Sequence, residues 1–88
     1  MIPRHRKPIH PGEILLKEFL EPMEMTQVAL AHKMQVPLQR INSLINGKRD
    51  MTPETAILLA SVLKTSPEFW MNLQTTRDLA LAQELVHA

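Results

Sequence analysis

The 88-residue chain is predicted to be all-α and to fold as a compact five-helix bundle. Apolar residues recur at intervals of three and four along most of its length, which is the period of an α-helix. Two segments also carry strong helix-start signals, Thr52-Pro53-Glu54 and Ser66-Pro67-Glu68. Each signal combines an N-cap hydroxyl, a proline and an acidic first turn. The length suits one domain and no more, and we place that domain at residues 10–88.

The first helix is predicted to open at His10-Pro11-Gly12-Glu13 and to end at Pro22. Glu13 lies near its amino end, where the helix dipole favours a negative charge. Two rows of apolar residues one turn apart give this helix a wide apolar face: Leu15 with Phe19, and Leu16 with Leu20.

Residues 26–49 predict two short helices joined by a tight turn and followed by a basic loop. Thr26 is a favourable N-cap for the first of them. Its apolar stripe is predicted to comprise Val28, Ala31 and Met34. Gln35 stands in the turn, where a left-handed residue, usually glycine, is needed. A non-glycine residue there costs roughly 1–2 kcal/mol, which the hydrophobic anchors Val36 and Ile41 can offset.

The second helix of this pair is expected to have Pro37 at its first position, where the missing N–H has no partner to lose. Its buried face is predicted to consist of Ile41, Leu44 and Ile45. Gly47 follows it and can adopt the left-handed conformation of a C-cap. Two short helices in this arrangement form the pattern of a helix-turn-helix, whose second helix enters the DNA major groove.

The charge distribution favours a polyanionic partner. The net charge is only +1, but residues 1–49 carry a net charge of +4 and residues 50–88 carry −3. No acidic residue lies between Glu24 and Asp50, the interval that contains the predicted helix-turn-helix. Such an acid-free surface attracts the DNA backbone, although small proteins also show this asymmetry by chance.

Residues 1–9 are predicted to form a flexible basic N-terminal arm outside the domain. They hold two prolines and several basic side chains, and too few apolar ones to build a core. One interpretation is an arm that touches phosphates or enters a minor groove. The other is a solvated terminus that keeps the protein in solution.

Two more helices are predicted after the basic loop. The first begins after Thr52 and is expected to bury Ile57, Leu59, Ala60 and Leu63. The last runs from Pro67 to about Val86, so its apolar residues continue beyond what a small core needs. We predict a homodimer interface there, made by Leu79, Leu81, Ala82, Leu85 and Val86. The alternative is a last helix that folds back over the first helix within one monomer.

Several classes of function are disfavoured. The chain has no cysteine, which excludes disulfides, thiolate zinc sites and cysteine catalysis. No apolar run approaches the roughly 20 residues of a membrane span, and no apolar stretch follows the basic N-terminus as in a secretory signal. No nucleophile, base and oxyanion donor come together, and His5 and His10 lack further ligands for a metal. We therefore expect a bacterial cytoplasmic protein that is no enzyme and has no cofactor, metal or small-molecule substrate.

Three segments carry a family resemblance: HPGEILLKEFLEP, MTQVALAHKMQVPLQRINSLINGKR and MTPETAILLASVLKTSPEFWMNLQ. They closely resemble the HigA-type antitoxins of the Cro/C1-like (XRE) helix-turn-helix family, over about residues 9–82. The resemblance implies a lambda-repressor-like fold and a type II toxin–antitoxin module. Such a protein neutralises a RelE/HigB-like toxin that cuts mRNA, and it represses its own operon at a palindromic operator. The implied partners are double-stranded operator DNA, the cognate HigB-like toxin and a second copy of the chain.

The exposed start of the second motif helix is predicted to read bases. Gln39 can pair with the N6 and N7 atoms of adenine, whereas Leu38 can make only apolar contact, as with a thymine methyl. Arg40 suits either a guanine or a phosphate, and Ser43 can reach the next base. Phosphate contacts are expected on the two flanks of the helix, from Gln27, Asn46, Lys48 and Arg49.

Two other functions stay open on the sequence alone. The first is a stand-alone helix-turn-helix transcriptional repressor without a toxin partner. The second is a protein-interaction module that has lost DNA binding, against which the acid-free interval argues.

Overall fold

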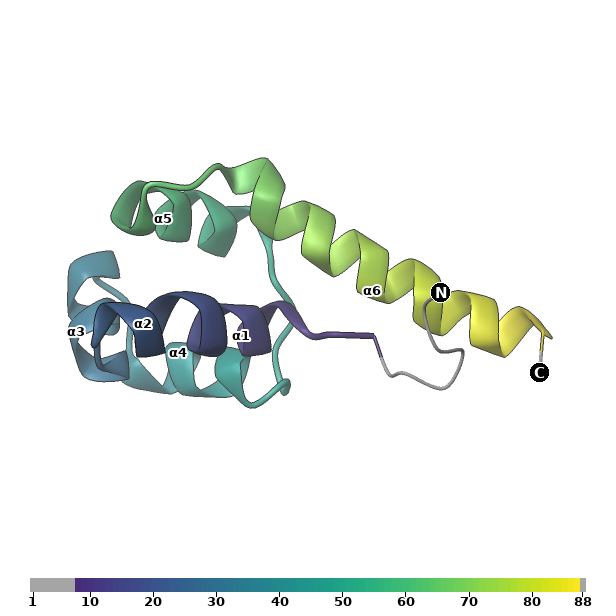
Figure 1. Cartoon of the computed structure of the whole chain (residues 1–88), viewed down its shortest axis with the longest axis horizontal. Coiled ribbons are helices and arrows are strands. Elements are labelled where there is room, and N and C mark those ends of the chain that lie inside the picture. The colour runs from purple at the N-terminus through teal and green to yellow at the C-terminus, as the bar shows by residue number, and fades with distance from the viewer. Residues whose placement is uncertain (1–7, 88) are drawn as a thin grey trace.

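The computed structural model describes residues 8–87 of the chain. These residues form helices and no strand: α1 (Pro11–Ile14), η1 (Leu15–Leu20), α2 (Glu21–Met23), α3 (Gln27–Met34), α4 (Leu38–Ile45), α5 (Pro53–Leu63) and α6 (Pro67–His87). Because α1, η1 and α2 follow one another without a gap, they make one rod, called here the first rod (Figure 1). The described chain thus has five helical rods, which confirms the predicted all-α fold. Residues 1–7 of the predicted arm lie outside the described residues.

The first rod does not end at Pro22 as the sequence suggested. Its middle six residues are π-helical, so that the N–H of Glu21 donates to the carbonyl of Leu16, five residues back. In a regular α-helix a proline ring clashes with the carbonyl four residues back, and the wider π-helical turn relieves that clash. The rod therefore continues to Met23, and Glu24 ends it in the left-handed conformation with φ 53°.

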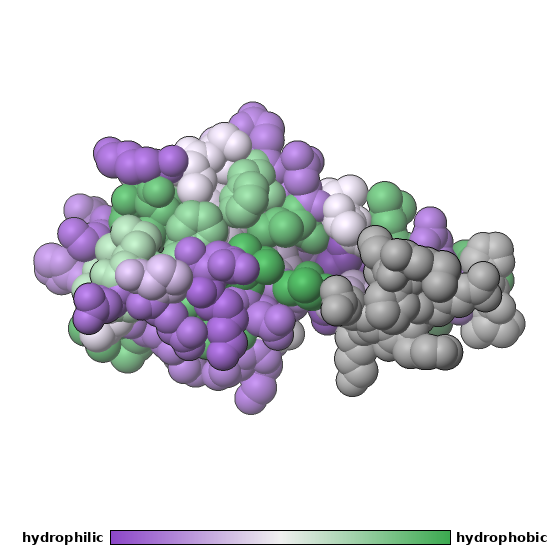
Figure 2. Space-filling view, in the orientation of Figure 1, coloured by the Kyte–Doolittle hydropathy of each residue, from purple (hydrophilic) through white to green (hydrophobic). Residues whose placement is uncertain are grey.

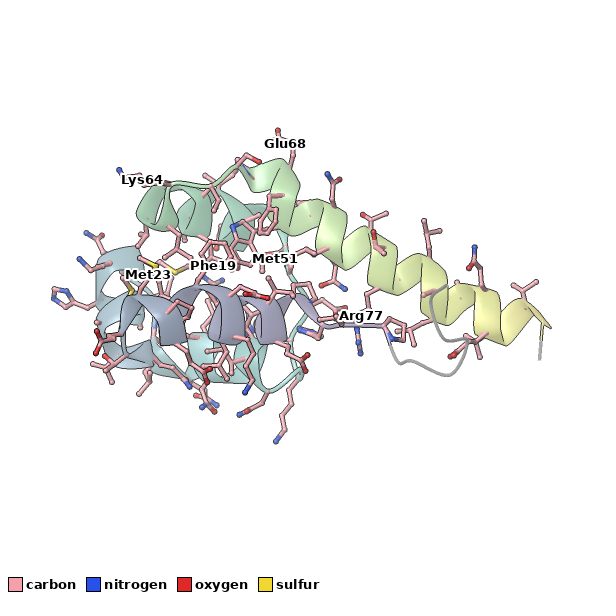
Figure 3. All side chains as sticks on the ribbon, viewed as in Figure 1. Phe19, Met23, Met51, Lys64, Glu68 and Arg77 are labelled. Carbon is pink, nitrogen blue, oxygen red and sulfur yellow. The ribbon has the colours of Figure 1, made fainter. Side chains whose placement is uncertain are left out.

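The core is built around the start of α6. Trp70 is fully buried, and its indole N–H donates to Thr65 Oγ1 at 2.8 Å. The ring of Phe19, from the first rod, packs against it with ring centroids 5.2 Å apart. Phe69 packs edge-on to the same indole at 4.9 Å. Figure 3 shows Phe19 between the first rod and the helices above it, and in Figure 2 hydrophobic surface gathers over this middle region.

A backbone contact fixes the first rod against α4. A Cβ added to Gly12 would lie 1.9 Å from the carbonyl oxygen of Leu44 and 2.9 Å from Cα of Ile45. Only glycine permits this approach, since any side chain would push the two helices apart. The orientation of α4 is therefore set on its inner side by main-chain atoms as well as by the buried Ile41 and Leu44.

Two residues predicted to be buried are exposed. Val28 is 62% exposed, because α3 buries Leu30, Ala31 and Met34 instead. Ile57 is 58% exposed, because the buried face of α5 is formed by Thr55, Ala56, Leu59, Ala60 and Leu63. Both helices carry more apolar residues than one face holds, so spacing alone did not identify the buried set.

The outer half of α6 projects beyond the rest of the molecule (Figure 1). Its inner half is tied to two other segments. Gln74 is buried and accepts a hydrogen bond from the N–H of Met51 at 2.7 Å. Arg77, seen beside the chain that leads into α1 in Figure 3, donates to the carbonyl of Pro8 at 2.9 Å. Beyond Ala80 the described side chains are exposed, so α6 does not fold back over the first rod.

Candidate nucleic-acid interface

The turn between α3 and α4 has the predicted geometry. Thr26 caps α3 by accepting the N–H of Ala29 at 3.0 Å. Gln35 ends α3 in the left-handed conformation, with φ 57° and ψ 45°. The N–H of Val36 then donates back to the carbonyl of Ala31 at 3.0 Å. Pro37 was expected to be the first residue of α4 but is its N-cap, so the helix begins one residue later, at Leu38.

The outer side of α4 presents the residues predicted to read bases. Leu38 is 46% exposed, Gln39 and Asn42 are exposed, and Ser43 is half-buried. Ile41 and Leu44 are fully buried on the opposite side. The helix is therefore held from behind and leaves one polar face available to a ligand.

Arg40 is oriented by a neighbour. Its Nη2 atom lies 3.1 Å from Oε1 of Glu54, in the first turn of α5, and its side chain is 27% exposed. The ion pair places the guanidinium on the side of α4 that holds Ser43 and faces Arg49 of the basic loop. These three residues, with Pro37 and Gln39, line an open hollow of about 480 Å³.

A chain of amide side chains joins the two phosphate-binding flanks that the sequence predicted. Asn42 donates from Nδ2 to Oε1 of Gln27 at 3.3 Å. Its own Oδ1 accepts a hydrogen bond from Nδ2 of Asn46 at 3.1 Å. Sequence reasoning missed Asn42. Its position one turn before Asn46 on the exposed face was the available signal.

The basic loop after α4 is also ordered by its backbone. Gly47 has φ 75°, and the N–H of Lys48 donates to the carbonyl of Ser43 at 2.9 Å. This is the closing turn of a helix C-cap, and a left-handed glycine allows it. Lys48 and Arg49 are exposed just beyond this turn.

His10, the N-cap of the first rod, packs against this loop. Its Nδ1 accepts the N–H of Gly12 at 2.9 Å, and its ring lies against Gly47. Its Nε2 is buried and, in the described part of the chain, has no hydrogen-bond partner; Asp50 Oδ1 is 3.9 Å away. Burial, reinforced by the charge of Arg77, lowers the pKa of His10 against the opposing pull of Asp50. Among residues 8–87 no cluster of three or more side chains could hold a metal ion.

A second open hollow, of about 500 Å³, lies on the other side of Gln39. Its lining comes from both motif helices: Thr26, Gln27, Val28, Leu38, Gln39 and Asn42. Gln39 borders both hollows and so stands on the ridge between them. The two hollows therefore make one continuous surface through Gln39, and it includes the four residues predicted to contact bases and two of those predicted to contact phosphates, Gln27 and Arg49.

These features define a helix-turn-helix DNA-binding protein. The second helix of the motif, α4, is packed against the core and has a polar outer face. The amino end of α3 lies on one flank of that face, and a basic loop follows it. Among residues 8–87 no helix has the length and apolar character needed to cross a membrane.

Comparison with known proteins agrees with this class. A helix-turn-helix family model matches residues 16–70. The chain is 47% identical over 74 residues to antitoxin HigA-1 of Vibrio cholerae, a match that covers 84% of this chain and 70% of that protein. It is 45% identical over 74 residues to the uncharacterized HTH-type transcriptional regulator YbaQ of Escherichia coli, with coverage of 84% and 66%. The solved structure of Pseudomonas aeruginosa antitoxin HigA with the higBA promoter superposes with a TM-score of 0.86 at 39% identity, covering 90% of this chain and 86% of that one.

The chain belongs to the HigA antitoxin group of the Cro/C1-type helix-turn-helix family. This family consists of DNA-binding antitoxins and transcription regulators and is not an enzyme family. The matched region spans about two thirds of the length of the curated relatives, 66% for YbaQ and 70% for HigA-1.

Proposed function

We propose that this chain is the antitoxin of a type II toxin–antitoxin module. It neutralises a RelE/HigB-like toxin that cuts mRNA, and it represses its own operon by sequence-specific binding to operator DNA. It acts in the bacterial cytoplasm, by binding and not by catalysis. The observation that carries the proposal is the continuous surface on α3, α4 and the basic loop, which has the exposed Gln39 at its centre and lies in an interval without acidic residues.

The side chains of this surface take two roles in the proposal. Leu38, Gln39, Arg40 and Ser43 contact base edges in the major groove. Gln27, Asn46, Lys48 and Arg49 contact phosphates on either side, which fixes the register of the protein on the duplex. In contacting DNA, Arg40 gives up part of its ion pair with the exposed Glu54.

A homodimer completes the proposed repressor, because a palindromic operator presents two equal half-sites. The exposed apolar residues of the projecting α6 supply the interface: Leu79, Leu81, Ala82, Leu85 and Val86. Apolar surface that covers no core of its own is typical of an interface between chains.

The experiment that tests DNA recognition is binding of the purified chain to DNA from directly upstream of its own gene. A random duplex of equal length is the control, and both are titrated across a salt series. The proposal expects tighter binding to the upstream DNA and a steep loss with salt, roughly 0.9 logarithmic units per decade of salt for each phosphate contact. Equal, weak binding to both duplexes would contradict specific recognition and favour the interaction module that has lost DNA binding.

A repressor without a toxin is the second candidate, since the relative YbaQ is named only as a transcriptional regulator. Co-expression with the neighbouring open reading frame separates the two functions. Antitoxin function expects that the neighbouring product alone stops growth and that this chain restores growth and co-purifies with it. Operator binding with no such partner would favour the stand-alone repressor.

A further inference from the structure

The hollow on the α3 side of Gln39 exposes two large apolar side chains at the predicted DNA surface. Val28 is 62% exposed and Leu38 is 46% exposed, and both line the hollow. They come from different helices, Val28 from the first turn of α3 and Leu38 from the first residue of α4. Neither side chain is needed to fill the core, so the helix-turn-helix fold does not explain their apolar character.

The side chains of Thr26, Gln27 and Asn42 in the lining each make a hydrogen bond within the protein. Gln27 and Asn42 are joined by a hydrogen bond of 3.3 Å, and the hydroxyl of Thr26 caps α3. None of the six lining residues carries a charge. The hollow on the other side of Gln39 contains two arginines, Arg40 and Arg49. The two hollows therefore suit different ligands, the charged one an anion or a guanine edge and the uncharged one an apolar group.

We propose that the uncharged hollow receives the 5-methyl group of thymine, with Leu38 and Val28 as its two apolar walls. This inference rests on the proposed operator binding and names the chemical group read there. Thymine is the only base that presents an apolar group in the major groove. The hollow adjoins Gln39 and lies in the interval without acidic residues, so it is continuous with the surface to which the duplex is assigned.

The expected effect follows from the size of the group. Removing one methyl group from contact with water corresponds to about a fourfold change in an equilibrium constant. A dimer that reads two half-sites combines two such changes. We therefore expect the thymine methyls of the operator to contribute about fourfold to sixteenfold to its affinity.

The test compares two forms of the upstream duplex, one with thymine and one with uracil at every thymine position, because uracil lacks only the 5-methyl group. A random duplex in both forms controls for general effects of the missing methyls on DNA shape. The unmodified chain is expected to bind the uracil form of the upstream duplex about fourfold to sixteenfold more weakly, with no such loss on the random duplex.

Substitutions test whether Val28 and Leu38 are the apolar walls that contact the thymine methyl group. Val28→Ala and Leu38→Ala together are expected to bring the thymine-to-uracil affinity ratio close to one. Val28→Thr keeps the branched shape of the side chain but replaces one methyl group with a hydroxyl, and it is expected to lower the ratio part of the way. Ile57→Ala is the matched control, because Ile57 is a β-branched residue that is 58% exposed on α5 and lies outside the hollow. Circular dichroism of each variant confirms that it is folded.

Two results would overturn the inference while leaving operator binding intact. The first is equal affinity of the unmodified chain for the thymine and uracil forms of the upstream duplex. The second is a thymine preference that survives in the folded Val28→Ala/Leu38→Ala variant. Failure of the unmodified chain to prefer upstream over random DNA in the thymine form would overturn operator binding itself and this inference with it.

Discussion

The recognition helix α4 and the outer half of α6 both expose apolar side chains, but only α4 is also packed against the core. On α4, Leu38 stands among polar neighbours on a helix whose inner side is fully buried at Ile41 and Leu44. On α6, every described residue from position 81 onward is exposed, and Leu85 reaches 81%. An exposed apolar residue is therefore best interpreted together with the burial of the opposite side of its helix. A lone one on an anchored helix suits a small ligand group, whereas a whole unsupported end suits a second chain.

The largest effect is expected from truncating a buried side chain on the inner side of α4. Ile41→Ala leaves a cavity under the recognition helix and is expected to lower the free energy of unfolding by about 2–5 kcal/mol. Leu38→Ala, on the exposed side of the same helix, is the control and should change it by about 0.5 kcal/mol or less. Denaturant unfolding measures both. Similar losses for the two variants would contradict the assigned inner and outer faces.

The unsupported end of α6 should respond in the opposite way. Leu85→Asp is expected to leave the fold intact and to weaken homodimer formation by about 1.5–3 kcal/mol for each protomer, through loss of apolar burial. Sedimentation equilibrium across protein concentrations gives the dimer dissociation constant. Gln83→Asp introduces the same charge nearby without removing an apolar group. An unchanged dimer constant for Leu85→Asp would place the interface elsewhere.

The role of the outer face of α4 is tested by changing its central polar residue, Gln39. Gln39→Ala should weaken binding to the upstream duplex by about 1–3 kcal/mol and spare binding to random DNA, because a base reader contributes only at the right sequence. Titration of both duplexes at one salt concentration measures the difference. An equal loss on random DNA would make Gln39 a phosphate contact.

Asn42 should have a smaller effect, since it acts through its neighbours. Asn42→Ala removes the hydrogen bonds to Gln27 and Asn46 and is expected to weaken operator binding by about 0.5–1.5 kcal/mol. A double-mutant cycle with Gln27→Ala tests the mechanism. If the two losses simply add, Asn42 does not position Gln27.

The smallest expected effect is a pH dependence at His10, behind the basic loop. Its pKa is lower in the folded chain than in the unfolded chain, so the unfolded state binds the proton more readily. Stability is therefore complete above the unfolded pKa of about 6.5 and declines as the pH falls below it towards the folded pKa. His10→Asn keeps an N-cap side chain and should flatten this part of the profile.

The sequence predicted those features that depend on neighbouring residues. Thr26, Thr52 and Ser66 cap their helices as expected, and Gln35 takes the left-handed turn position. The predictions were wrong where burial depends on parts of the chain that are distant in sequence. Periodicity placed Val28 and Ile57 in the core, because it shows that a helix is apolar but not which of two possible stripes meets a neighbour.

The candidate surface shows the same division. The exposed positions of α4 follow from its local pattern, since Ile41 and Leu44 mark the opposite side. The contacts that tie the surface together join residues 14 or 15 positions apart, as between Arg40 and Glu54 or Asn42 and Gln27. Nothing in the local sequence indicates such pairs. The Asn42–Gln27 bond forms once the turn at Gln35 has brought α4 across α3, and the Arg40–Glu54 pair forms once the loop after α4 has brought α5 beside it.

The contact at Gly12 has a consequence for how such proteins diversify. Main-chain atoms of α4 meet the first rod there, so the contact does not depend on which side chains α4 carries outward. In the proposed roles of Leu38, Gln39 and Ser43, substitutions at these positions therefore alter the preferred DNA sequence without moving the helix that presents them. Descendants of one ancestral gene can acquire separate operators by changing a few codons of a single helical face, while the rest of the architecture stays constant.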